Sequence, residues 1–588
     1  MSKPINRKQL RRRYFLFGLF VLVLIVLFFL HFGYLSEFSE PSPTLLVDTL
    51  VHMREHPFEI FPVRSKSLLS GIFAGMLAPL VTDLEYMKRR DLRPSIENGS
   101  AKWNDNLSEY QKMYTDLPLL GTGSPNIILT DTIFLSMNTR KTLRNNNVMV
   151  IGGSGTGKSR GFIIPNVLQL NCCYVITDPS GELLRSMGDF LRENDYEVRV
   201  FNLVDMENSG HYNPFSYLKE DKDVLTLMTA LISNTTPKGS KSNDPFWEKA
   251  ETALIQACCF YLLGVDKKEN TQKASFAGVM ELLRLASSEE GVAPPLDDLF
   301  TVYEEKHGKD MAVTSYAIFK SAGGGKTAQT IVICAQTRLQ VFNLQAIQKL
   351  TGEDTLRLDE IGDKKVALFC VTPTEDKTFN FLVGLLYTQL FNTLYRKGEF
   401  SAEGRLKVHT RFLLDEFANI GRIPDFAEKL STMRKYEISC SIVIQALSQI
   451  KAMYKDEWEV LISNCDSLLY LGTNDETTNK YISAALGKET IRAMNTSISK
   501  GRQGSSSQSY NKVGRELMTP DELKKLDNKD CILFIRGLDP FYSKKFVLKH
   551  HPNYIHTPLA KGTPISKKRN FRARKRKLPK EEPRNDEI

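Results

Sequence analysis

Residues 148–159, VMVIGGSGTGKS, decide the fold of this chain. The first four are β-branched or long apolar residues, as a buried parallel strand requires. The glycines that follow end in Lys158 and Ser159, which completes the pattern of glycine, four residues, glycine, lysine and serine found in phosphate-binding loops. We therefore predict a strand, a phosphate-binding loop and a helix that begins at Gly157.

Each residue type in this loop suits the binding of a triphosphate. Glycines let the backbone turn tightly and bring its N–H groups close to phosphate oxygens. We expect Lys158 to reach the β- and γ-phosphates and the Ser159 hydroxyl to bind Mg²⁺, while the helix directs its positive end at the phosphates. The predicted ligands are therefore ATP and Mg²⁺. The residues predicted to hold them are Gly152, Gly153, Ser154, Gly155, Thr156, Gly157, Lys158 and Ser159.

An acidic pair follows a later apolar run. Residues 408–414, VHTRFLL, end at Asp415 and Glu416. In phosphate-loop ATPases such a pair holds Mg²⁺ through its waters and polarises the attacking water. We assign the first task to Asp415, together with Ser159, and the second to Glu416. Gln445 ends the next strand and is a candidate sensor of the γ-phosphate, an ordinary strand-end amide being the alternative.

Hydrolysis of ATP also needs a cation that neutralises charge in the transition state. The stretch 431–435, STMRK, lies between the acidic pair and Gln445. Its Arg434 is a candidate arginine finger for the ATP of a neighbouring subunit, and a solvated surface arginine is the alternative. At the end of strand 172–177, Asp178 either faces the nucleotide or caps the helix that follows.

Composition agrees with a folded protein of two or three domains. The chain has 588 residues, of which 42% are hydrophobic and 25% charged, unlike a disordered chain. A net charge of +10 suits a partner with phosphates or an anionic membrane face. The nine cysteines include no Cys-x-x-Cys pair, which favours small core residues over a disulfide or zinc framework.

The apolar runs predict an α/β fold with a mostly parallel sheet of seven or more strands, because long crossovers separate them. From residue 214 to residue 343 the apolar spacing becomes helical, which predicts a helical insertion. Residues 323–327, GGGKT, imitate a phosphate loop, but no strand precedes them. Residues 497–512 are polar and are interpreted as flexible. The predicted strands are 148–151, 172–177, 197–202, 365–371, 408–414, 438–444, 467–471 and 531–535.

Two apolar segments near the start predict a membrane anchor. Residues 14–32 are long enough to cross a bilayer, and no small-x-small cleavage site follows them as in a signal peptide. Residues 67–82 are shorter, but Gly71 and Gly75 offer a small-residue face for close packing. Cationic residues lie before the first segment and after the second. This predicts a two-pass hairpin in the cell membrane with the N-terminus and the ATPase part in the cytoplasm.

Together these motifs resemble the type IV secretion coupling proteins, the TraG/TraD-like conjugation ATPases, in the form found in Gram-positive mobile elements. The resemblance covers residues 10 to 550. It rests on the order of a membrane hairpin, the phosphate loop and the stretches TDPSGEL (177–183), LLDEFANIG (413–421), STMRKYEIS (431–439) and IQALSQI (444–450).

The resemblance implies a nucleotide-binding domain of the RecA/FtsK type that forms a homo-hexameric ring. It implies that ATP hydrolysis moves single-stranded DNA with its attached relaxase into the secretion channel, and that the all-α insertion recognises the relaxosome. In the family, an arginine nineteen positions after the acidic-pair aspartate acts on the neighbouring subunit, and Arg434 has that position. Gln445 falls on the family's strand-end glutamine.

The predicted domain order is a membrane anchor (1–90), a nucleotide-binding domain in two parts (91–213 and 344–553), the all-α insertion (214–343) and a basic disordered tail (554–588). An alternative function is a substrate-docking receptor of the secretion channel that uses ATP for protein unfolding or gating. A solute transporter is disfavoured because two spans form no solute pathway and the ABC signature is absent. A membrane AAA-type protease is disfavoured because no His-Glu-x-x-His occurs. An FtsK-type chromosome pump is disfavoured because it would carry four spans, a long linker and a winged-helix end, none of which is visible in this sequence.

Overall fold

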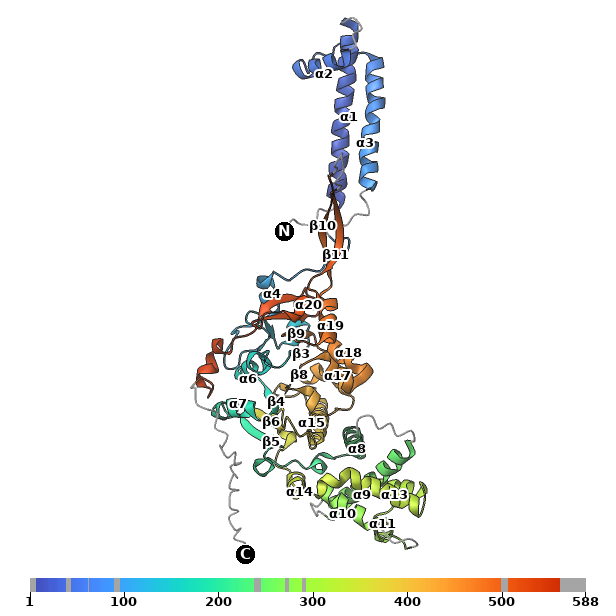
Figure 1. Ribbon diagram of the computed structural model, residues 1–588, viewed down its shortest axis with the longest axis vertical. Coiled ribbons are helices and arrows are strands. Elements are labelled where there is room, and N and C mark those ends of the chain that lie inside the picture. Colours follow the sequence, from blue (N-terminus) through green and yellow to red (C-terminus); the bar gives the residue numbers. More distant parts are fainter. Residues whose placement is uncertain are drawn as a thin grey trace. The chain divides into compact units, whose positions relative to one another are not determined.

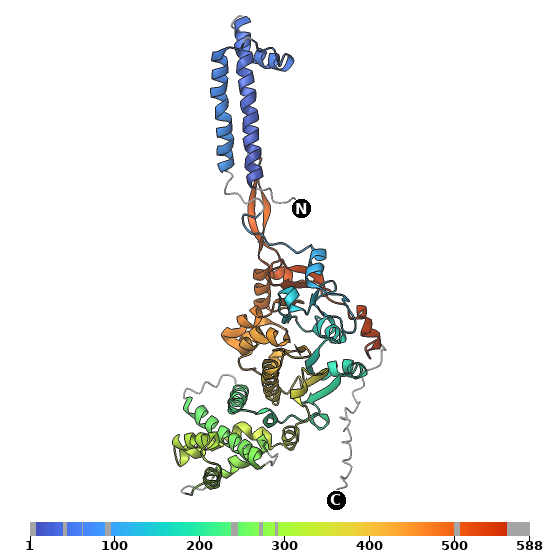
Figure 2. The same ribbon diagram turned by 180° about the vertical axis from the view of Figure 1, so that it is seen from behind.

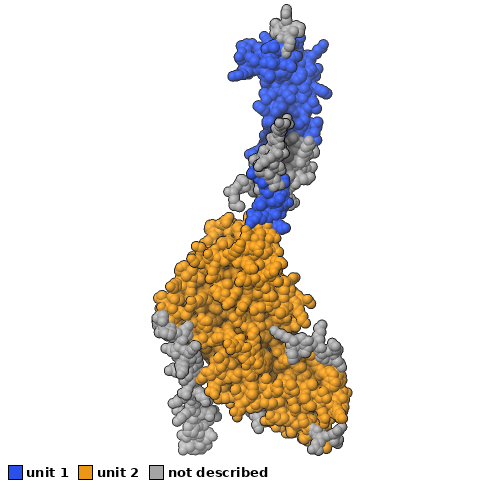
Figure 3. Space-filling view, in the orientation of Figure 1, with its two compact units in different colours: residues 1–100, 488–515 blue, residues 101–487, 516–588 orange. Residues whose placement is uncertain are grey.

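The computed structural model divides into two compact units (Figure 3). The first contains residues 1–100 and 488–515, and the second contains residues 101–487 and 516–588. The predicted disordered tail, 554–588, is wrong for residues 554–560, which are ordered and include the end of the 3-10 helix Pro552–His556, whereas residues 561–588 lie outside the described residues. The structure describes residues 7–38, 44–61, 63–88, 96–236, 245–269, 274–287, 292–498 and 506–560.

Two long helices make up most of the first unit. Helices α1 (Arg7–Phe38) and α3 (Ser65–Lys88) lie side by side (Figures 1 and 2), and the short helix α2 (Leu45–Glu55) lies between them in the chain. Both long helices contain a stretch apolar and long enough to cross a membrane, Arg12–Glu37 and Ser65–Thr82. These stretches include the two predicted spans. The cationic residues predicted to follow the second span, from Arg89 on, lie outside the described residues.

Close packing of the two long helices depends on glycine. A Cβ atom at Gly71 would lie 3.0 Å from the Phe29 Cβ, and one at Gly75 would lie 3.1 Å from the Leu22 Cγ. Side chains at these two positions would force the helices apart, since such contacts are tighter than ordinary van der Waals contact. The predicted small-residue face of the second span is therefore confirmed.

The first unit also contains a two-stranded sheet formed by β10 (Lys488–Ile498) and β11 (Ser506–Glu516). The interpretation of residues 497–512 as a flexible segment is therefore wrong for its described parts, residues 497–498 in β10 and 506–512 in β11. These strands lack an apolar face because they belong to a separate small sheet and not to the core sheet. The Asn98 backbone N–H donates to the Thr490 hydroxyl, which ties the chain after α3 to this sheet.

A nine-stranded sheet forms the centre of the second unit, in the order β13-β12-β9-β3-β8-β7-β4-β6-β5. From β9 to β5 all neighbours are parallel, and at one edge β12 pairs antiparallel with both β9 and β13. The prediction of a mostly parallel sheet is confirmed. The strands are β3 (Val148–Ile151), β4 (Cys173–Pro179), β5 (Glu197–Asn202), β6 (Val366–Thr372), β7 (Thr410–Leu414), β8 (Ile438–Ile444), β9 (Ser467–Tyr470), β12 (Asp530–Ile535) and β13 (Phe541–Lys544).

The sheet is buried because both faces are covered. Every residue of β3, β6, β7, β8 and β9 is buried, as expected for parallel strands between helical layers. A small hairpin of β1 (Asn126–Ile128) and β2 (Phe134–Ser136) precedes β3. The helices of this part are α4 (Leu107–Tyr114), α5 (Thr139–Thr142), α6 (Ile164–Leu168), α7 (Glu182–Glu193), α15 (Phe381–Phe400), α16 (Phe426–Thr432), α17 (Leu447–Tyr454), α18 (Trp458–Ser463), α19 (Glu476–Leu486) and α20 (Pro520–Lys524).

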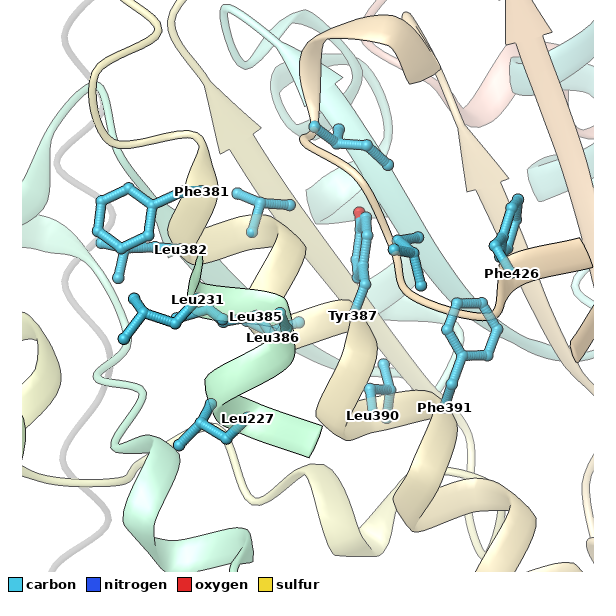
Figure 4. Packing of buried hydrophobic residues seen from close by; sticks show 14 of the residues in the cluster. Leu227, Leu231, Phe381, Leu382, Leu385, Leu386, Tyr387, Leu390, Phe391 and Phe426 are labelled. Atoms are coloured by element: carbon cyan, nitrogen blue, oxygen red, sulfur yellow. The ribbon is translucent and has the colours of Figure 1, made fainter. Parts of the chain in front are cut away.

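The segment between β5 and β6 is helical in its described part (Figures 1 and 2). Its first helix packs Leu227 and Leu231 against Phe381, Leu382 and Leu385 of α15, beside the sheet (Figure 4). Residues 323–325 form a loop that follows a helix and not a strand, and residues 326–327 begin the next helix, so the GGGKT stretch lacks the strand that a phosphate loop requires. The helices are α8 (Asp221–Thr235), α9 (Pro245–Glu269), α10 (Phe276–Leu285), α11 (Pro295–His307), α12 (Met311–Ser321), α13 (Lys326–Leu339) and α14 (Gln345–Gly352).

Short 3-10 helices connect several of these elements. They are η2 (Met206–Asn208), η3 (Pro214–Tyr217), η4 (Gln340–Asn343), η5 (Leu358–Glu360), η6 (Phe417–Asn419), η7 (Met433–Tyr436), η8 (Lys455–Glu457), η9 (Leu548–His550) and η10 (Pro552–His556).

Candidate nucleotide site

The phosphate loop follows β3 at the carboxyl edge of the sheet, where ligands of open parallel sheets bind. Gly155 and Gly157 have φ of 76° and 87°, a backbone region that favours glycine. A Cβ at Gly152 would lie 2.9 Å from the Leu471 Cβ, so this position also needs glycine. Gly155 and Gly157 thus serve the tight turn that the sequence motif predicts, and Gly152 allows close packing against Leu471, directly after β9.

The helix after the loop begins where the motif predicts, but its first turn is wider than expected. The Gly161 N–H donates to the Gly157 carbonyl at 2.6 Å, and the first segment, η1 (Ser159–Ile163), is a π-helix. The Ile164 N–H donates to the Ser159 carbonyl, five residues back. Pro165 follows, has no N–H to continue an ordinary ladder and crowds the carbonyl four residues before it, which accounts for the wider turn.

Lys158 is held inside the loop. Its Nζ donates to the carbonyl of Gly152 at 2.8 Å and to that of Gly153 at 3.0 Å. Burial lowers the pKa of Lys158, and the carboxylates of Asp415 and Glu416 act in the opposite direction. The ammonium group therefore lies where a triphosphate could replace two weak carbonyl contacts with stronger charge-assisted ones.

The acidic pair lies beside the phosphate loop. Asp415 ends β7, two strands from β3, and the Ser159 hydroxyl donates to its Oδ2 at 2.9 Å. Burial raises the pKa of Asp415 to about 6, and the Ser159 hydrogen bond and the Lys158 charge limit that rise. A hydroxyl and a carboxylate in contact are oxygen ligands of the kind that Mg²⁺ prefers. The predicted metal ligands are therefore brought together.

Glu416 has its carboxylate fixed from two sides. The residue adopts a left-handed backbone conformation, with φ of 50°, which turns the chain sharply after β7. The Gln445 Nε2 donates to its Oε1 at 3.3 Å, and the Asn419 Nδ2 donates to its Oε2 at 2.8 Å. The Lys377 Nζ in turn donates to the Asn419 side-chain oxygen at 2.8 Å. Gln445 and Glu416 thus lie together, as the two strand ends predict.

Asp178 has the second of its two predicted roles. Its two carboxylate oxygens accept the backbone N–H groups of Leu183 and Leu184, at 2.9 and 2.7 Å, at the start of α7. The carboxylate is fully buried, and burial raises its pKa to about 7 although both hydrogen bonds favour the ionised form. Asp178 is therefore a helix cap.

Arg434 lies away from the phosphate loop of its own chain. It belongs to η7, which precedes β8, whereas Gln445 follows β8. At about 3.3 Å per residue, β8 separates these two ends by about 20 Å. The exposed Arg434 side chain donates to the Thr139 carbonyl at 2.8 Å. Arg434 is thus at the amino edge of the sheet, opposite the phosphate loop, and does not join the other predicted catalytic residues within one chain.

Sequence comparison adds the family. Residues 109–567 match the family described as Type IV secretory system Conjugative DNA transfer, which is more than half of the chain. The chain belongs to this family. The predicted resemblance to TraG-like coupling proteins is thereby confirmed, and relatives are identical to this chain at about a quarter of the aligned residues.

Two relatives and one solved structure show how similar this chain is to known proteins. Protein VirD4 of Rhizobium radiobacter is 25% identical over 410 residues, covering 68% of this chain and 56% of VirD4. Conjugal transfer protein TraG of Escherichia coli is 24% identical over 459 residues, covering 71% and 69%. The bacterial conjugative coupling protein TrwBdeltaN70 has a TM-score of 0.56 at 16% identity, covering 78% and 95%. The chain spans just over half the length of the VirD4 proteins that it matches.

Two residues of this coupling-family site were not predicted. Asn419 lies only three residues after Glu416, and the asparagine within LLDEFANIG was the available signal. Lys545 lies far along the chain, yet its Nζ donates to the carbonyls of Thr156 and Leu471 at 2.9 and 2.8 Å. Nothing in the sequence around Lys545 indicates this contact, because it depends on the position of the last strands beside the loop.

Proposed function

We propose that this chain is a membrane-anchored ATPase that couples a DNA–relaxase substrate to a type IV secretion channel and drives conjugative transfer of single-stranded DNA. The observation that carries this proposal is the convergence of Ser159, Asp415, Glu416 and Gln445 around the phosphate loop of a conjugative DNA transfer family member. A protein that only docks substrates would not need a water-activating carboxylate held in place beside an intact phosphate loop.

Hydrolysis would use the residues as follows. The Lys158 ammonium exchanges its two loop carbonyls for the β- and γ-phosphate oxygens and stabilises the charge that develops on them. Glu416 orients the attacking water and accepts its proton, since Gln445 and Asn419 fix both of its oxygens. Gln445 follows β8 and donates to the Glu416 carboxylate directly. A change at the γ-phosphate would therefore be transmitted through Gln445 to β8.

Mg²⁺ fits the same site. The Ser159 hydroxyl and the Asp415 carboxylate are in contact and both are hard oxygen ligands. When bound with ATP, Mg²⁺ supplies neutralisation of the charge on the β- and γ-phosphates. Asp415 would need to be ionised for this role, and its Oδ2 would exchange the hydrogen bond from the Ser159 hydroxyl for the cation.

Arg434 completes the site of a neighbouring subunit in this proposal. It lies at the opposite edge of the sheet from its own phosphate loop, and it donates there to an exposed backbone carbonyl, a contact that can be exchanged at small cost. A head-to-tail ring presents the amino edge of one subunit to the carboxyl edge of the next, and rotation by a sixth of a turn closes it. We therefore include a homo-hexamer in the proposal.

The other parts have roles in the same proposal. Helices α1 and α3 form a two-pass anchor with the N-terminus and the ATPase part in the cytoplasm. The segment 214–343 is an all-α domain that binds the relaxosome, and residues 91–213 and 344–553 form the nucleotide-binding domain. The channel subunits would meet the anchor and its outer loop.

The experiment that tests this function is ATP hydrolysis by the full chain in detergent, with and without single-stranded DNA, over a range of protein concentrations. Turnover that rises with both DNA and concentration supports a DNA motor with sites completed between subunits. Turnover indifferent to DNA would instead favour a receptor that uses ATP for protein unfolding or gating.

Lys158→Ala provides the control for this experiment. It should abolish both turnover and conjugative transfer, because Lys158 is the only cationic residue of the phosphate loop itself. Transfer at the wild-type frequency by this variant would refute the motor. The neighbouring exposed Arg160→Ala is a matched charge-removing variant and should retain hydrolysis.

A further inference from the structure

A polar cluster lies at the amino edge of the sheet, close to Arg434 in the chain. Glu437 comes directly before β8, and His409 comes directly before the neighbouring strand β7. Because Thr410 pairs with Ile438 in parallel register, these two residues begin their strands next to one another. The proposed nucleotide site is at the opposite edge, so the cluster is separate from the phosphate loop of its own chain.

Hydrogen bonds join three side chains of this cluster in a row. The His409 Nδ1 lies 3.0 Å from the Glu437 Oε2, and the His409 Nε2 lies 2.8 Å from the Ser439 hydroxyl oxygen. An ionised carboxylate only accepts, so the Nδ1 of His409 donates to Glu437. The hydrogen bond from His409 is the largest cause of a lowered pKa at Glu437, and the charge of Arg405 acts in the same direction. Glu437 is therefore an ionised carboxylate held by an imidazole whose two nitrogens both have partners.

The order serine, histidine and glutamate is that of a hydrolase triad, but the burial of this cluster excludes such a role. Ser439 belongs to β8 and is fully buried, so no substrate can reach its hydroxyl. Its contact with the His409 ring instead attaches that ring to the interior of the sheet. The cluster thus connects a rigid strand to the half-buried carboxylate of Glu437.

Glu437 needs such support because of its backbone conformation. It ends η7 in the left-handed region, with φ of 59°, which residues other than glycine rarely adopt. Residues persist in such conformations only where the surrounding structure holds them. The Glu437 carbonyl accepts the Thr410 N–H at 2.9 Å, and its carboxylate accepts from His409. Its backbone and its side chain are therefore both tied to the start of β7.

The turn that Glu437 ends is the one that carries Arg434. The Glu437 N–H donates to the Arg434 carbonyl and closes η7, and the Tyr436 carbonyl accepts the Leu406 N–H at 3.3 Å. The Arg434 side chain is exposed and donates to the Thr139 carbonyl. An exposed hydrogen bond holds a side chain weakly. The direction in which Arg434 leaves the surface therefore depends on the backbone of η7.

We propose that His409 and Glu437 are positioning residues for Arg434, and that they hold η7 so that the guanidinium meets the nucleotide site of the neighbouring subunit. This role rests on the function proposed above and adds two residues to it that are remote from the nucleotide site of their own chain. Their effect should therefore belong to the subunit that supplies Arg434 and not to the subunit that supplies Lys158.

ATP hydrolysis by the full chain in detergent tests this role, first in single variants. His409→Ala should lower kcat by at least about tenfold and leave ADP affinity within about twofold of wild type, since a shift of about 1 Å in a catalytic group can cost about a hundredfold in rate. Glu437→Gln keeps an oxygen that accepts from the His409 Nδ1 and should be much more active than Glu437→Ala. Lys407→Ala is the matched control, because Lys407 is exposed and lies two residues before His409.

Rings that contain two variants distinguish the positioning of Arg434 from a structural defect. When His409→Ala and Lys158→Ala are co-expressed in equal amounts, about a quarter of the interfaces of a head-to-tail ring combine an intact Lys158 with an intact His409 and Arg434. Hydrolysis should then recover to about a quarter of the wild-type rate. When His409→Ala is mixed with Arg434→Ala, every interface lacks one of these two residues on the arginine side, and no recovery is expected.

The opposite pattern would overturn the inference. Recovery with Arg434→Ala but not with Lys158→Ala would show that His409 serves the phosphate loop of its own chain. Recovery with neither would show a general structural defect, and a wild-type kcat in His409→Ala would show no role at all; both results would also overturn it. Failure of the proposed function is a different result, because the mixture of Lys158→Ala and Arg434→Ala would then itself show no recovery.

Discussion

Replacing Arg434 by alanine tests whether the catalytic site is completed by a neighbouring subunit. Within one chain, β8 separates Arg434 from the Gln445 end of the site by about 20 Å, which an arginine side chain cannot span. Its hydrogen bond to the Thr139 carbonyl is exposed, and losing it costs about 1 kcal/mol or less of folding free energy. A large loss of hydrolysis in Arg434→Ala would therefore reflect chemistry and not unfolding.

The expected magnitude follows from the role of such arginines. An arginine finger contributes roughly 10³–10⁵ to kcat. Arg434→Ala should lose hydrolysis by at least about a thousandfold while ADP binding stays within about twofold of wild type. Lys435→Ala is the matched control, since it removes a charge from the same turn, where the Lys435 Nζ lies over the Tyr436 ring. This control should retain most of the wild-type rate.

Mixing two inactive variants gives a sharper assay. A site between subunits needs Lys158 from one chain and Arg434 from its neighbour. When Lys158→Ala and Arg434→Ala are co-expressed in equal amounts, about a quarter of the interfaces of a head-to-tail ring combine both intact residues. Hydrolysis should then recover to about a quarter of the wild-type rate if the sites act independently. A mixture no more active than either variant alone, in rings shown to contain both chains, would refute action between subunits.

Three further predictions concern the carboxylates of the site. Asn419→Ala removes one of two groups that hold Glu416, and kcat should fall about tenfold with an unchanged KM in steady-state assays; a change in KM alone would contradict the orienting role. Burial raises the pKa of Asp415 to about 6. Because Mg²⁺ binds the ionised carboxylate, the Mg²⁺-dependent part of ADP affinity should fall about fourfold from pH 7.5 to 5.5, and Asp415→Asn should abolish this pH dependence. Asp178→Ala removes a helix cap and should lower the free energy of unfolding by about 1–2 kcal/mol in denaturant titrations. The ADP affinity of Asp178→Ala should be unchanged. A marked loss of ADP affinity in this variant would instead support the prediction that Asp178 faces the nucleotide.

Much of the sheet and of the phosphate site could be predicted from local sequence. Buried parallel strands are continuous apolar runs, so segments such as Val148–Ile151 and Ile438–Ile444 are visible without a structure. The phosphate loop and the acidic pair are local motifs, because the backbone conformation that they require is encoded by neighbouring glycines and by position after a strand. Parallel pairing then brings Ser159, Asp415 and Gln445 to one edge of the sheet.

Local patterns fail where another part of the chain decides the conformation. Strands β10 and β11 carry polar residues and pair outside the core sheet, so no apolar alternation marks them. Asp178 could not be assigned from sequence, since both predicted roles need a carboxylate at a strand end.

Sequence alone therefore determined most strands of the core sheet, the phosphate loop, the acidic pair and the two long apolar helices, because each is a property of adjacent residues. Only the tertiary structure decided which residues, distant in the sequence, lie near the phosphate loop and which lie far from it. It placed Arg434 at the far edge of the sheet from its own loop, and it brought Lys545 to the Thr156 carbonyl from 389 positions along the chain. The physical reason is that strand order and the packing of the last strands set these distances, and no local spacing contains them.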